Sequence, residues 1–420
     1  MRVIIAGGGL GGLTLALSLH AVGIEAEVFE AAPELKPVGV GINLLPHAAR
    51  ELIELGLGEV LAENAIATEA LMYANRFGQE IWREPRGRFA GYDWPQYSIH
   101  RGTLQMLLLD AVKARLGEAA VHANRQVVRA ETSDTGARIW LKDASGADRG
   151  AAEGDVLVAC DGIHSVIRAQ FYPDEGPPKW NQRVLWRGIS RAGPFLGGAT
   201  MIMAGHQDQK FVAYPIDPRA GDRSTINWIA ELRFPETDVW TREDWNRGGR
   251  LDDFLPRFED WDFGWLDVPG VIRAAEKVYE YPLVDRDPIE RWTFGRITLL
   301  GDAAHPMYPI GSNGASQAIL DARTLAFDLA TAPGVDEALA RYEAARRPAT
   351  TRLVLLNRGN GPEQVMQLAH ERAPNGFAGV HEVLSQAELE ASAGEYKKAA
   401  GFDRDALNKR ASLSAPSAPQ

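Results

Sequence analysis

Six residues near the amino terminus have the composition and spacing of a phosphate-binding turn. Residues 7–12 read Gly-Gly-Gly-Leu-Gly-Gly and fit the pattern G-x-G-x-x-G. In this pattern the first glycine allows a tight turn, the second lets the backbone approach a pyrophosphate, and the third allows close packing of helix and sheet. The pyrophosphate would lie at the positive end of the helix that follows. The pattern predicts dinucleotide contacts at Gly7, Gly9, Leu10, Gly11 and Gly12.

An acidic residue stands where such a site needs one. Glu30 ends the next predicted strand, and a carboxylate about 20 residues after the glycines accepts hydrogen bonds from ribose hydroxyls. A purely structural glycine-rich turn is the alternative interpretation. The turn by itself does not distinguish a nicotinamide dinucleotide from FAD.

Two apolar runs further along the chain each end close to an aspartate. One run leads into Asp161 and Gly162, and the other into Gly301 and Asp302. In an open α/β sheet, ligands bind beyond the carboxyl ends of the strands, so these acids would face the same ligand as the glycine turn. Either aspartate taken singly is more typical of a plain turn.

The elements around these motifs alternate between strand and helix. Strands are predicted at 2–6, 25–30, 155–160 and 296–300, and helices at 10–20, 104–115 and 314–331. This order predicts an open parallel sheet with helices on both faces. Between residues 180 and 233, four apolar segments separated by Gly, Pro and Asp turns predict a mostly antiparallel second domain.

Composition excludes several classes of function. The 420 residues carry a formal net charge of −11, which offers no basic stripe for nucleic acid or anionic lipid. A single cysteine excludes internal disulfides and thiolate metal sites, and it fits a reducing, cytoplasmic location. No apolar run is long enough to span a bilayer. We expect no metal site, no nucleic-acid partner and no membrane span.

Taken together, the three motifs resemble those of the single-component FAD-dependent aromatic hydroxylases. The runs GVGINLLPHA from Gly39, PQYSIHRGTLQM from Pro95 and GDAAHPMYPIGSNGASQAILDA from Gly301 resemble the phenazine-carboxylate monooxygenase branch of that family. The similarity covers roughly residues 1–350. One departure is the loop Gly311-Ser-Asn-Gly314, where the wider family often has Gly-Gln-Gly.

The resemblance implies roles for individual residues. Asp302 would hydrogen-bond the ribityl chain of FAD, and Arg101 would bind the cofactor's phosphates. Asp161 and Gly162 would serve both FAD and the pyridine nucleotide. Further FAD contacts are expected at Val40, Gly41, Gln105, Gly301 and, at the adenine, the backbone of Val127.

The loop before residue 314 has a physical interpretation of its own. Pro309, Gly311 and Gly314 precede a predicted helix whose first amides would point at the flavin pyrimidine edge. Negative charge gathers there when the flavin is reduced, and a helix amino terminus stabilises it. The alternative is a simple helix-start turn without a ligand.

The predicted fold class is α/β, with a Rossmann-like FAD-binding domain interleaved with a mostly antiparallel β-sheet substrate domain and followed by a helical C-terminal segment. The FAD-binding domain is assigned residues 1–72, 97–170 and 285–360. The substrate domain is assigned residues 73–96 and 171–284. Residues 361–400 are expected to be helical, and residues 401–420 to be a disordered tail.

The predicted function is that of an FAD-dependent monooxygenase. The resemblance implies that NADH or NADPH, as a transient co-substrate, reduces FAD and that O₂ then gives a C4a-hydroperoxyflavin. This species would hydroxylate an aromatic or heteroaromatic acid or phenol, with decarboxylation where it attacks a carboxylate-bearing carbon. Because the flavin carries the chemistry, no residue is assigned as catalytic. Candidate substrate contacts are Asn43, Arg187, Met203, Tyr214, Trp228 and Tyr308.

Two other functions stay open at this point. One is a flavin-dependent reductase or dehydrogenase similar to the prenyl reductases, which forms no hydroperoxide. The other is a non-catalytic flavin-binding sensor. The expected partner is a small aromatic substrate, and the expected assembly is a monomer or homodimer.

Overall fold

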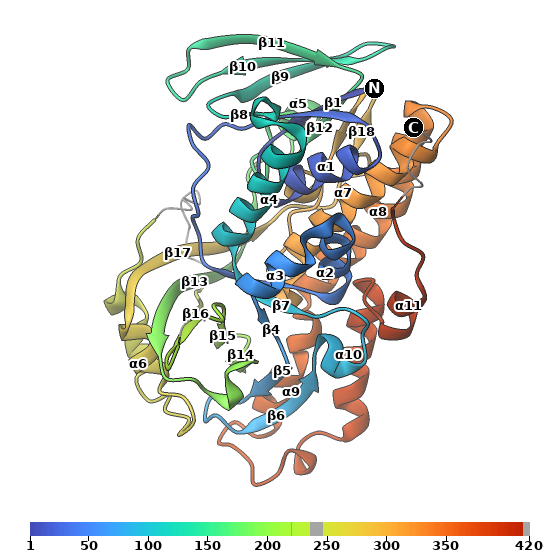
Figure 1. The fold of residues 1–420 in the computed structure, drawn as a ribbon. Helices are drawn as coiled ribbons and strands as arrows, with labels where there is room; N and C mark the ends of the chain where they lie inside the picture. Colours follow the sequence, from blue (N-terminus) through green and yellow to red (C-terminus); the bar gives the residue numbers. More distant parts are fainter. Residues whose placement is uncertain (220, 236–246, 415–420) are drawn as a thin grey trace.

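The upper part of the molecule in Figure 1 is built on a six-stranded sheet. The computed structural model describes residues 1–219, 221–235 and 247–414. All neighbouring strands are parallel except the first pair, which confirms the predicted open parallel sheet. The order is β18(Thr293–Phe294), β19(Ile297–Leu299), β12(Val156–Ala159), β1(Arg2–Ala6), β2(Glu25–Phe29) and β8(Val121–His122). Strands β1 and β12 are buried on both faces, as in other sheets covered by helices.

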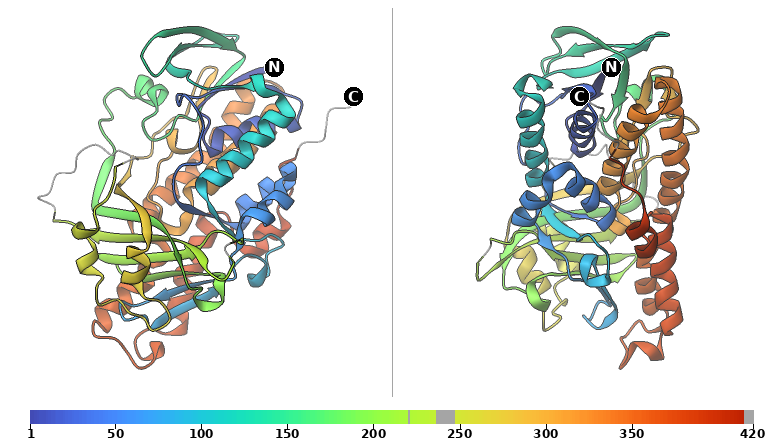
Figure 2. Two further views of the ribbon diagram at one scale, coloured as in Figure 1. Left: turned by 60° about the vertical axis from the view of Figure 1, so that its left-hand side comes forward. Right: turned by 45° about the vertical axis from the view of Figure 1, so that its right-hand side comes forward.

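The helices that cover this sheet begin close to the motifs. Helix α1(Leu10–Ala21) lies between α4(Arg101–Leu116) and α7(Gly314–Thr331), as Figure 2 shows. Nearly every residue of α1 is buried, which is why its sequence is apolar on most sides. Helix α8(Val335–Arg358) packs along α7. The three predicted helices are therefore confirmed.

A seven-stranded sheet forms the lower half of the molecule (Figure 1). All its neighbouring pairs are antiparallel except β14 with β5, which confirms the predicted antiparallel character. The order is β17(Ala275–Asp285), β13(Lys179–Ala192), β16(Ser224–Arg233), β15(Gln209–Pro215), β14(Thr200–His206), β5(Ala70–Ala74) and β6(Glu80–Pro85).

The two faces of the seven-stranded sheet pack against different partners. One face carries Trp186 and Trp228, which pack with Phe254 and Trp261 from the segment between β16 and β17. The other face carries Met203 and packs against α9(Gln364–Arg372). Side chains alternate between the two faces along a strand. The position of a residue in its strand therefore decides which of these two partners its side chain contacts.

Smaller elements complete the fold. They are the antiparallel sheet of β9(Gln126–Thr132), β10(Ala137–Lys142) and β11(Asp148–Gly154), the sheet of β3(Gly41–Leu44), β7(Tyr97–His100) and β4(Ile66–Ala67), and the helices α2(Pro46–Leu52), α3(Gly58–Asn64), α5(Val166–Phe171) and α6(Val268–Arg273).

The C-terminal segment is ordered further than its composition suggests. After α10(Gln386–Ala399), the chain forms α11(Arg404–Lys409). Phe402 and Leu407 are buried in a cluster with Leu45 and Tyr92, which lie far away in the sequence. The predicted disordered tail is therefore wrong for residues 401–414, since these apolar side chains have a core to fill. Residues 415–420 lie outside the described residues.

The domain limits drawn from the sequence stay a prediction. The strand that starts the second sheet begins at Ala70, whereas the predicted border follows residue 72. Strand β17 ends at Asp285, next to the predicted border at 284. Because β5 belongs to the seven-stranded sheet, sheet membership would place the first border before Ala70 instead of after residue 72.

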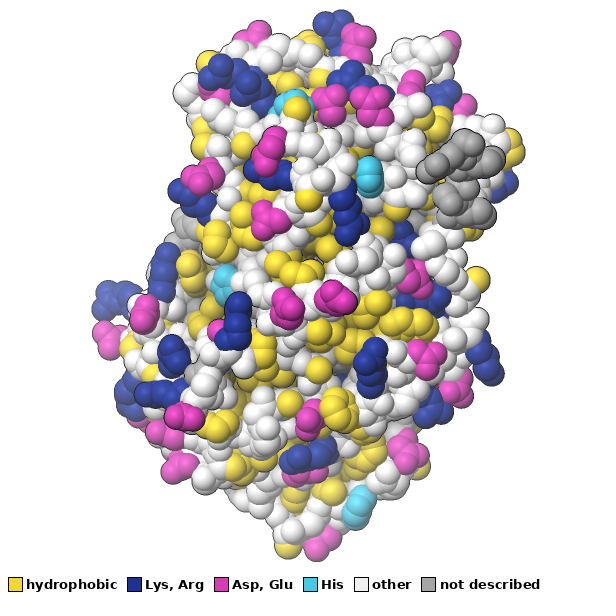
Figure 3. Space-filling view, viewed as in Figure 1, with side chains coloured by type: hydrophobic (Ala, Val, Ile, Leu, Met, Phe, Trp, Pro, Cys, Tyr) yellow, Lys and Arg dark blue, Asp and Glu magenta, His cyan; other side chains and the backbone are white. Residues whose placement is uncertain are grey.

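The exterior shows no segregation of charge on the face in view. In Figure 3, basic and acidic side chains are intermixed over both halves of that face. No described helix combines the length and the hydropathy that crossing a bilayer would require. Among the residues with assigned positions, no three His, Cys, Asp or Glu side chains are grouped to hold a metal ion.

We predict that Leu407→Ala lowers the free energy of unfolding by about 3 kcal/mol, because it leaves a cavity in a packed cluster. Leu407 is 1% exposed. The matched control is Leu355→Ala, at a leucine that is 54% exposed, where the change should stay within about 0.5 kcal/mol. Urea unfolding of the three proteins measures both values. Equal stability of the two variants would mean that the tail does not pack.

Candidate functional site

The glycine turn joins β1 to α1 and is shaped by close backbone contacts. Gly7 has a φ of +109°, and a Cβ there would lie 2.4 Å from the carbonyl oxygen of Cys160. A Cβ on Gly12 would lie 2.0 Å from the carbonyl oxygen of Gly7. Both positions therefore exclude a side chain. A Cβ on Gly11 would lie 2.8 Å from Leu300 Cδ2.

Gly9 differs from its neighbours because it faces open space. No heavy atom lies within 4 Å of its Cβ position, and it precedes α1 without a side-chain cap. The first amides of α1, beginning at Leu10, are thus free of side-chain acceptors. This is the arrangement that a pyrophosphate needs, since the ligand approaches the backbone and the positive end of the helix together.

Glu30 lies beside the same turn, as predicted. Its Oε2 accepts a hydrogen bond from the amide of Gly8 at 2.7 Å, and its Oε1 accepts one from Ala32 at 2.7 Å. The amide of Arg125 donates to the carbonyl oxygen of Glu30 at 2.8 Å, which brings β9 and the backbone of Val127 toward this edge of the sheet. The carboxylate therefore holds the turn in shape at the position expected for a ribose partner.

Arg101 and Gln105 approach the turn from the start of α4. Gln105 Nε2 donates to the carbonyl oxygen of Gly8 at 2.8 Å, and Arg101 Nη1 donates to Gln105 Oε1 at 3.3 Å. The amide of Arg101 donates to the carbonyl oxygen of Val40 at 2.8 Å. Burial lowers the pKa of Arg101, and the nearby carboxylate of Asp302 acts in the opposite direction. The structure thus brings the glycine turn, α4 and Asp302 to one site.

The second motif lies at the carboxyl end of β12. Asp161 Oδ2 accepts from the amide of Val166, the first residue of α5, at 2.9 Å, while its Oδ1 is buried without a partner among the described residues. Burial raises the pKa of Asp161. Gly162 has a φ of +80° and open space at its Cβ position. An unpaired buried oxygen beside an open backbone suits a ligand that donates a hydrogen bond.

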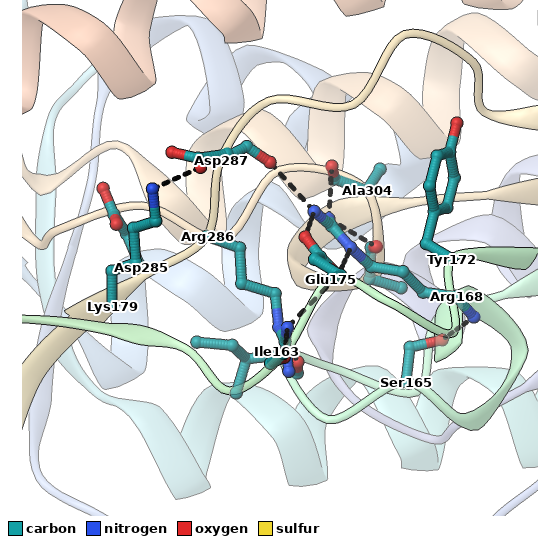
Figure 4. Close-up of polar contacts among 12 residues, drawn as sticks. Ile163, Ser165, Arg168, Tyr172, Glu175, Lys179, Asp285, Arg286, Asp287 and Ala304 are labelled. Carbon is teal, nitrogen blue, oxygen red and sulfur yellow. Dashed lines mark hydrogen bonds and ion pairs between the residues drawn. The ribbon is translucent and has the colours of Figure 1, made fainter. Parts of the chain in front are cut away.

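Arg168 connects the second motif to the third, a role that sequence reasoning missed. Figure 4 shows its guanidinium at the centre of a cluster of polar contacts. It donates to the carbonyl oxygens of Ala304 at 2.9 Å and Asp287 at 2.9 Å, and it pairs with Glu175. Arg286 donates to Ile163 and to Glu175 in the same cluster. The only sequence signal for this role was an arginine following the Asp161-Gly162 turn.

A buried network of charged side chains supports the third motif. Asp321 Oδ2 accepts from the amide of Gly301 at 3.1 Å and lies 2.5 Å from His305 Nε2. Arg346 Nε donates to Asp321 Oδ1 at 2.7 Å. Burial acts to raise the pKa of Asp321, but His305 and Arg346 outweigh it and bring the pKa to about 2. The network fixes the turn that presents Asp302.

Asp302 itself lies in the turn that this network supports. Its side chain is accessible to solvent, yet enough protein surrounds it that desolvation raises its pKa, against the influence of His305 and Arg101. An accessible carboxylate with few protein partners suits a hydroxyl-bearing ligand, as the ribityl chain would be.

The loop that precedes α7 is strained and pinned in place. Gly311 has a φ of +67°, and Ser312 has a φ of +57°, which is uncommon for a residue with a side chain. The hydroxyl of Tyr396, from α10, accepts from Asn313 Nδ2 at 2.9 Å and lies 3.0 Å from the carbonyl oxygen of Ile310. Gly314 has open space at its Cβ position, and the first amides of α7 carry no side-chain cap. Tyr396 was missed because its partners lie far away in the sequence.

A cavity opens on this loop. Its walls come from the seven-stranded sheet, the strained loop and the C-terminal segment. The lining residues are Leu45, Leu71, Tyr73, Glu84, Arg86, Gln96, Met201, Met203, Gly311, Ser312, Pro362, Tyr396, Lys397 and Phe402. Of the predicted substrate contacts, Met203 lies in this lining, and so does Gly311 of the predicted cofactor loop.

Three other predicted substrate residues lie outside the cavity lining, although Asn43 reaches one of its residues. Asn43 Oδ1 accepts from Ser98 at 2.6 Å, and its Nδ2 lies 3.5 Å from Ser312 Oγ. Arg187 Nη2 donates to the carbonyl oxygen of Gly41 at 2.8 Å. Tyr214 is buried on the same sheet face as Met203, and burial raises its pKa to about 12. Their roles toward a substrate stay predictions.

The prediction for Trp228 is wrong. Its side chain is fully buried on the opposite sheet face, where Nε1 donates to Ser190 Oγ at 2.9 Å. The neighbouring Asn227 faces the site instead, and its Oδ1 accepts from the amide of Gly41 at 2.7 Å. Tyr308 lies in an apolar cluster with Ile310, outside the cavity lining, and its substrate role stays a prediction.

The residues present fit FAD. The open backbone at Gly9, Gly162 and Gly314 would allow a pyrophosphate and a ring to approach closely, and the first amides of α1 and α7 carry no side-chain cap that would compete with them. Arg101 supplies a positive charge, and Asp302 supplies a free acceptor.

We predict that Gly9→Val gives a folded protein without FAD. The backbone at Gly9 has a φ of −75° and open space for a Cβ, so valine is tolerated by the fold but occupies the approach of the pyrophosphate. Gly193→Val is the control, since this glycine also has open space and lies in a distant loop. Flavin absorbance per mole of protein reports the result. Full flavin content in Gly9→Val would refute the assignment.

We predict that Asp321→Asn lowers the free energy of unfolding by about 3 kcal/mol, because it leaves His305 and Arg346 without their buried partner. Because the folded pKa of Asp321 is depressed, its stabilising effect is complete above about pH 4 and is lost as the pH falls through about 2. Asp252→Asn, at a carboxylate that is 88% exposed, is the control. Denaturant titrations between pH 7 and pH 2 test this, and identical pH profiles for wild type and Asp321→Asn would contradict it.

Comparisons with known proteins agree with this site. The family described as FAD binding domain matches residues 1–182 and 283–356. The chain is 47% identical to the phenazine 1,6-dicarboxylic acid hydroxylase of Lysobacter antibioticus over 361 residues, which is 85% of this chain and 89% of that protein. It is 34% identical to a 3-amino-4-hydroxybenzoate 2-monooxygenase of Streptomyces platensis, covering 86% of this chain and 88% of that protein.

Solved structures share the fold. A salicylate hydroxylase substrate complex aligns with a TM-score of 0.74 and 21% identity, covering 100% of this chain and 98% of that chain. HpxO of Klebsiella pneumoniae, complexed with FAD and uric acid, aligns with a TM-score of 0.71 and 22% identity, covering 99% and 97%. Sequence motifs, site geometry and relatives therefore agree, and the chain belongs to the FAD-binding family of single-component aromatic hydroxylases.

Proposed function

We propose that this protein uses FAD, NADH or NADPH, and O₂ to hydroxylate an aromatic or heteroaromatic acid. The observation that carries the proposal is the cavity that opens on Gly311 and Ser312, directly before the uncapped start of α7. A ring in this cavity would lie against the edge of the cofactor site. Bound FAD supplies the electron transfer and the activation of oxygen.

The protein's own groups would orient the cofactor and stabilise charge. The turn at Gly9 and Arg101 would hold the phosphates, and Asp302 would hold the ribityl hydroxyls. The uncapped amides at the start of α7 would present a positive field to the ring edge, where reduction places negative charge. These amides need no movement to act, because Tyr396 and Asn313 hold the loop.

The cavity walls exclude water from a bound ring. Apolar side chains from the sheet and the C-terminal segment, such as Leu71, Met203 and Phe402, surround it and are almost fully buried. Water exclusion protects a reactive oxygen species from wasteful breakdown. The C-terminal segment therefore forms part of the proposed substrate site.

The chemical class of the substrate is inferred from the relatives and the cavity together. The names of two relatives give a phenazine dicarboxylic acid and an aminohydroxybenzoate as their substrates. In simple hydroxylation, one oxygen atom of O₂ enters the ring, and the other leaves as water with hydrogen from NAD(P)H and a proton. If the attacked carbon bears a carboxylate, the same oxygen transfer takes up one further proton, and carbon dioxide leaves in place of a ring hydrogen.

The cellular setting is part of the proposal. The single cysteine, Cys160, is partly buried, and a chain without disulfides suits a reducing cytoplasm. We propose that the protein acts as a monomer or as a homodimer.

We predict that aromatic acids stimulate NAD(P)H oxidation by the purified holoprotein. Phenazine-1-carboxylate, phenazine-1,6-dicarboxylate, 3-hydroxybenzoate and 3-amino-4-hydroxybenzoate form the panel, each tested with NADH and NADPH. The expected result is equimolar consumption of O₂ and NAD(P)H and a product that carries one oxygen atom from ¹⁸O₂. Release of carbon dioxide identifies the decarboxylating course.

Other outcomes point to the alternatives. NAD(P)H consumption with reduction of an added acceptor but no labelled product would indicate a reductase. Flavin binding with no stimulation by any compound of the panel would indicate a sensor and would contradict the proposed function.

A further inference from the structure

The cavity lining contains a buried arginine whose guanidinium lacks a full set of hydrogen-bond partners. Arg86 follows β6 and is 8% exposed, and its Nε is buried with no partner among the described residues. The nearest carboxylate oxygen, Glu84 Oε1, lies 3.7 Å from Arg86 Nη2, which is beyond hydrogen-bond distance. A buried guanidinium normally forms hydrogen bonds that repay its desolvation. Its free donor is available to a ligand.

Glu84 is already engaged by another cation. Lys397 Nζ, from α10, donates to Glu84 Oε2 at 2.5 Å. Burial acts to raise the pKa of Glu84, but Arg86 and Lys397 outweigh it and hold the pKa below its ordinary value, so the carboxylate is charged. Two cations against one anion leave this wall of the cavity with one excess positive charge.

Two neutral polar groups in the lining also have unused hydrogen-bonding capacity. Tyr73 is 1% exposed, and Gln96 is 2% exposed. The Tyr73 hydroxyl lies beside the Arg86 guanidinium and donates to no acceptor among the described residues, and Gln96 Oε1 has no hydrogen-bond partner among them. Burial raises the pKa of Tyr73, so its hydroxyl stays protonated and can donate. Both side chains line the same cavity as Arg86.

These groups match one kind of ligand. Arg86 Nε and Tyr73 Oη are donors for a carboxylate, and Gln96 Oε1 is an acceptor for a neighbouring hydroxyl or N–H group. The rest of the lining is largely apolar, with Leu45, Met201 and Phe402 suited to an aromatic ring. The excess charge equals that of a single carboxylate.

We propose that Arg86, Tyr73 and Gln96 form a specificity subsite that binds a carboxylate on the aromatic substrate and so sets which ring edge faces Gly311 and Ser312. The inference rests on the proposed function, because it takes this cavity as the substrate site. Arg86 is a positioning residue here. The ion pair of Lys397 and Glu84 leaves the charge of Arg86 as the excess positive charge of this wall.

Binding, rather than turnover, tests the subsite. The probes are phenazine-1-carboxylate and its neutral isostere phenazine-1-carboxamide, titrated calorimetrically into the FAD-loaded protein. We expect wild type to bind the carboxylate more tightly, and Arg86→Met to reduce this preference by about 30-fold, since losing a partner of a buried charge costs about 2 kcal/mol. Arg83→Met, at an exposed arginine of the same strand, should leave the preference unchanged.

Two further variants keep the test decisive if Arg86→Met fails to fold. Arg86→Lys keeps the charge without the planar fork and should retain part of the preference. Tyr73→Phe removes one neutral donor and should weaken carboxylate binding by about 5-fold while leaving the carboxamide less affected. A merely structural role for these residues would change both probes equally.

Several outcomes would overturn the subsite. They are wild type binding neither probe, wild type binding both equally, or folded Arg86 and Tyr73 variants that keep the wild-type preference. The proposed function fails separately. Carboxylate-selective binding that depends on Arg86, with no labelled product from any acid, would retain the subsite and reject the monooxygenase activity.

Discussion

The structure depends on the contact between backbones at the glycine turn. A Cβ on Gly7 would collide with the end of β12, and a Cβ on Gly12 would collide with Gly7, so β1, β12 and α1 can meet only without these side chains. That contact leaves the amides of α1 open beyond Gly9. Because the neighbouring strands are parallel and in register with β1, Glu30, Asp161 and the Asp302 turn end at the same edge of the sheet.

Buried charges extend this arrangement into the second half of the molecule. Arg168 joins the loop after β12 to backbone oxygens near Ala304, and Asp321 joins the Asp302 turn to His305 and Arg346. Removing one partner from such a network leaves a buried charge uncompensated and strongly destabilises the fold. The C-terminal helices then close the cavity through Tyr396.

Much of the fold and the cofactor site could be predicted because the signals are local. Glycines 7 and 12, the apolar strands and the acids at their ends are readable from neighbouring residues. Trp228 was misassigned because a shift of one position moves a side chain to the other face of a strand. The tail was misassigned because its composition hid Phe402 and Leu407, whose packing partners are distant. Arg86 and Tyr396 gave no local signal, since their roles depend on contacts across the chain.

The most direct test of this account is a crystal structure of the FAD-loaded protein with phenazine-1-carboxylate bound. The account predicts the pyrophosphate on the amides after Gly9, the flavin ring against the start of α7, and the phenazine between that ring and the sheet with its carboxylate on Arg86. FAD bound away from the glycine turn, or the phenazine bound outside the cavity that Gly311 and Ser312 line, would contradict it.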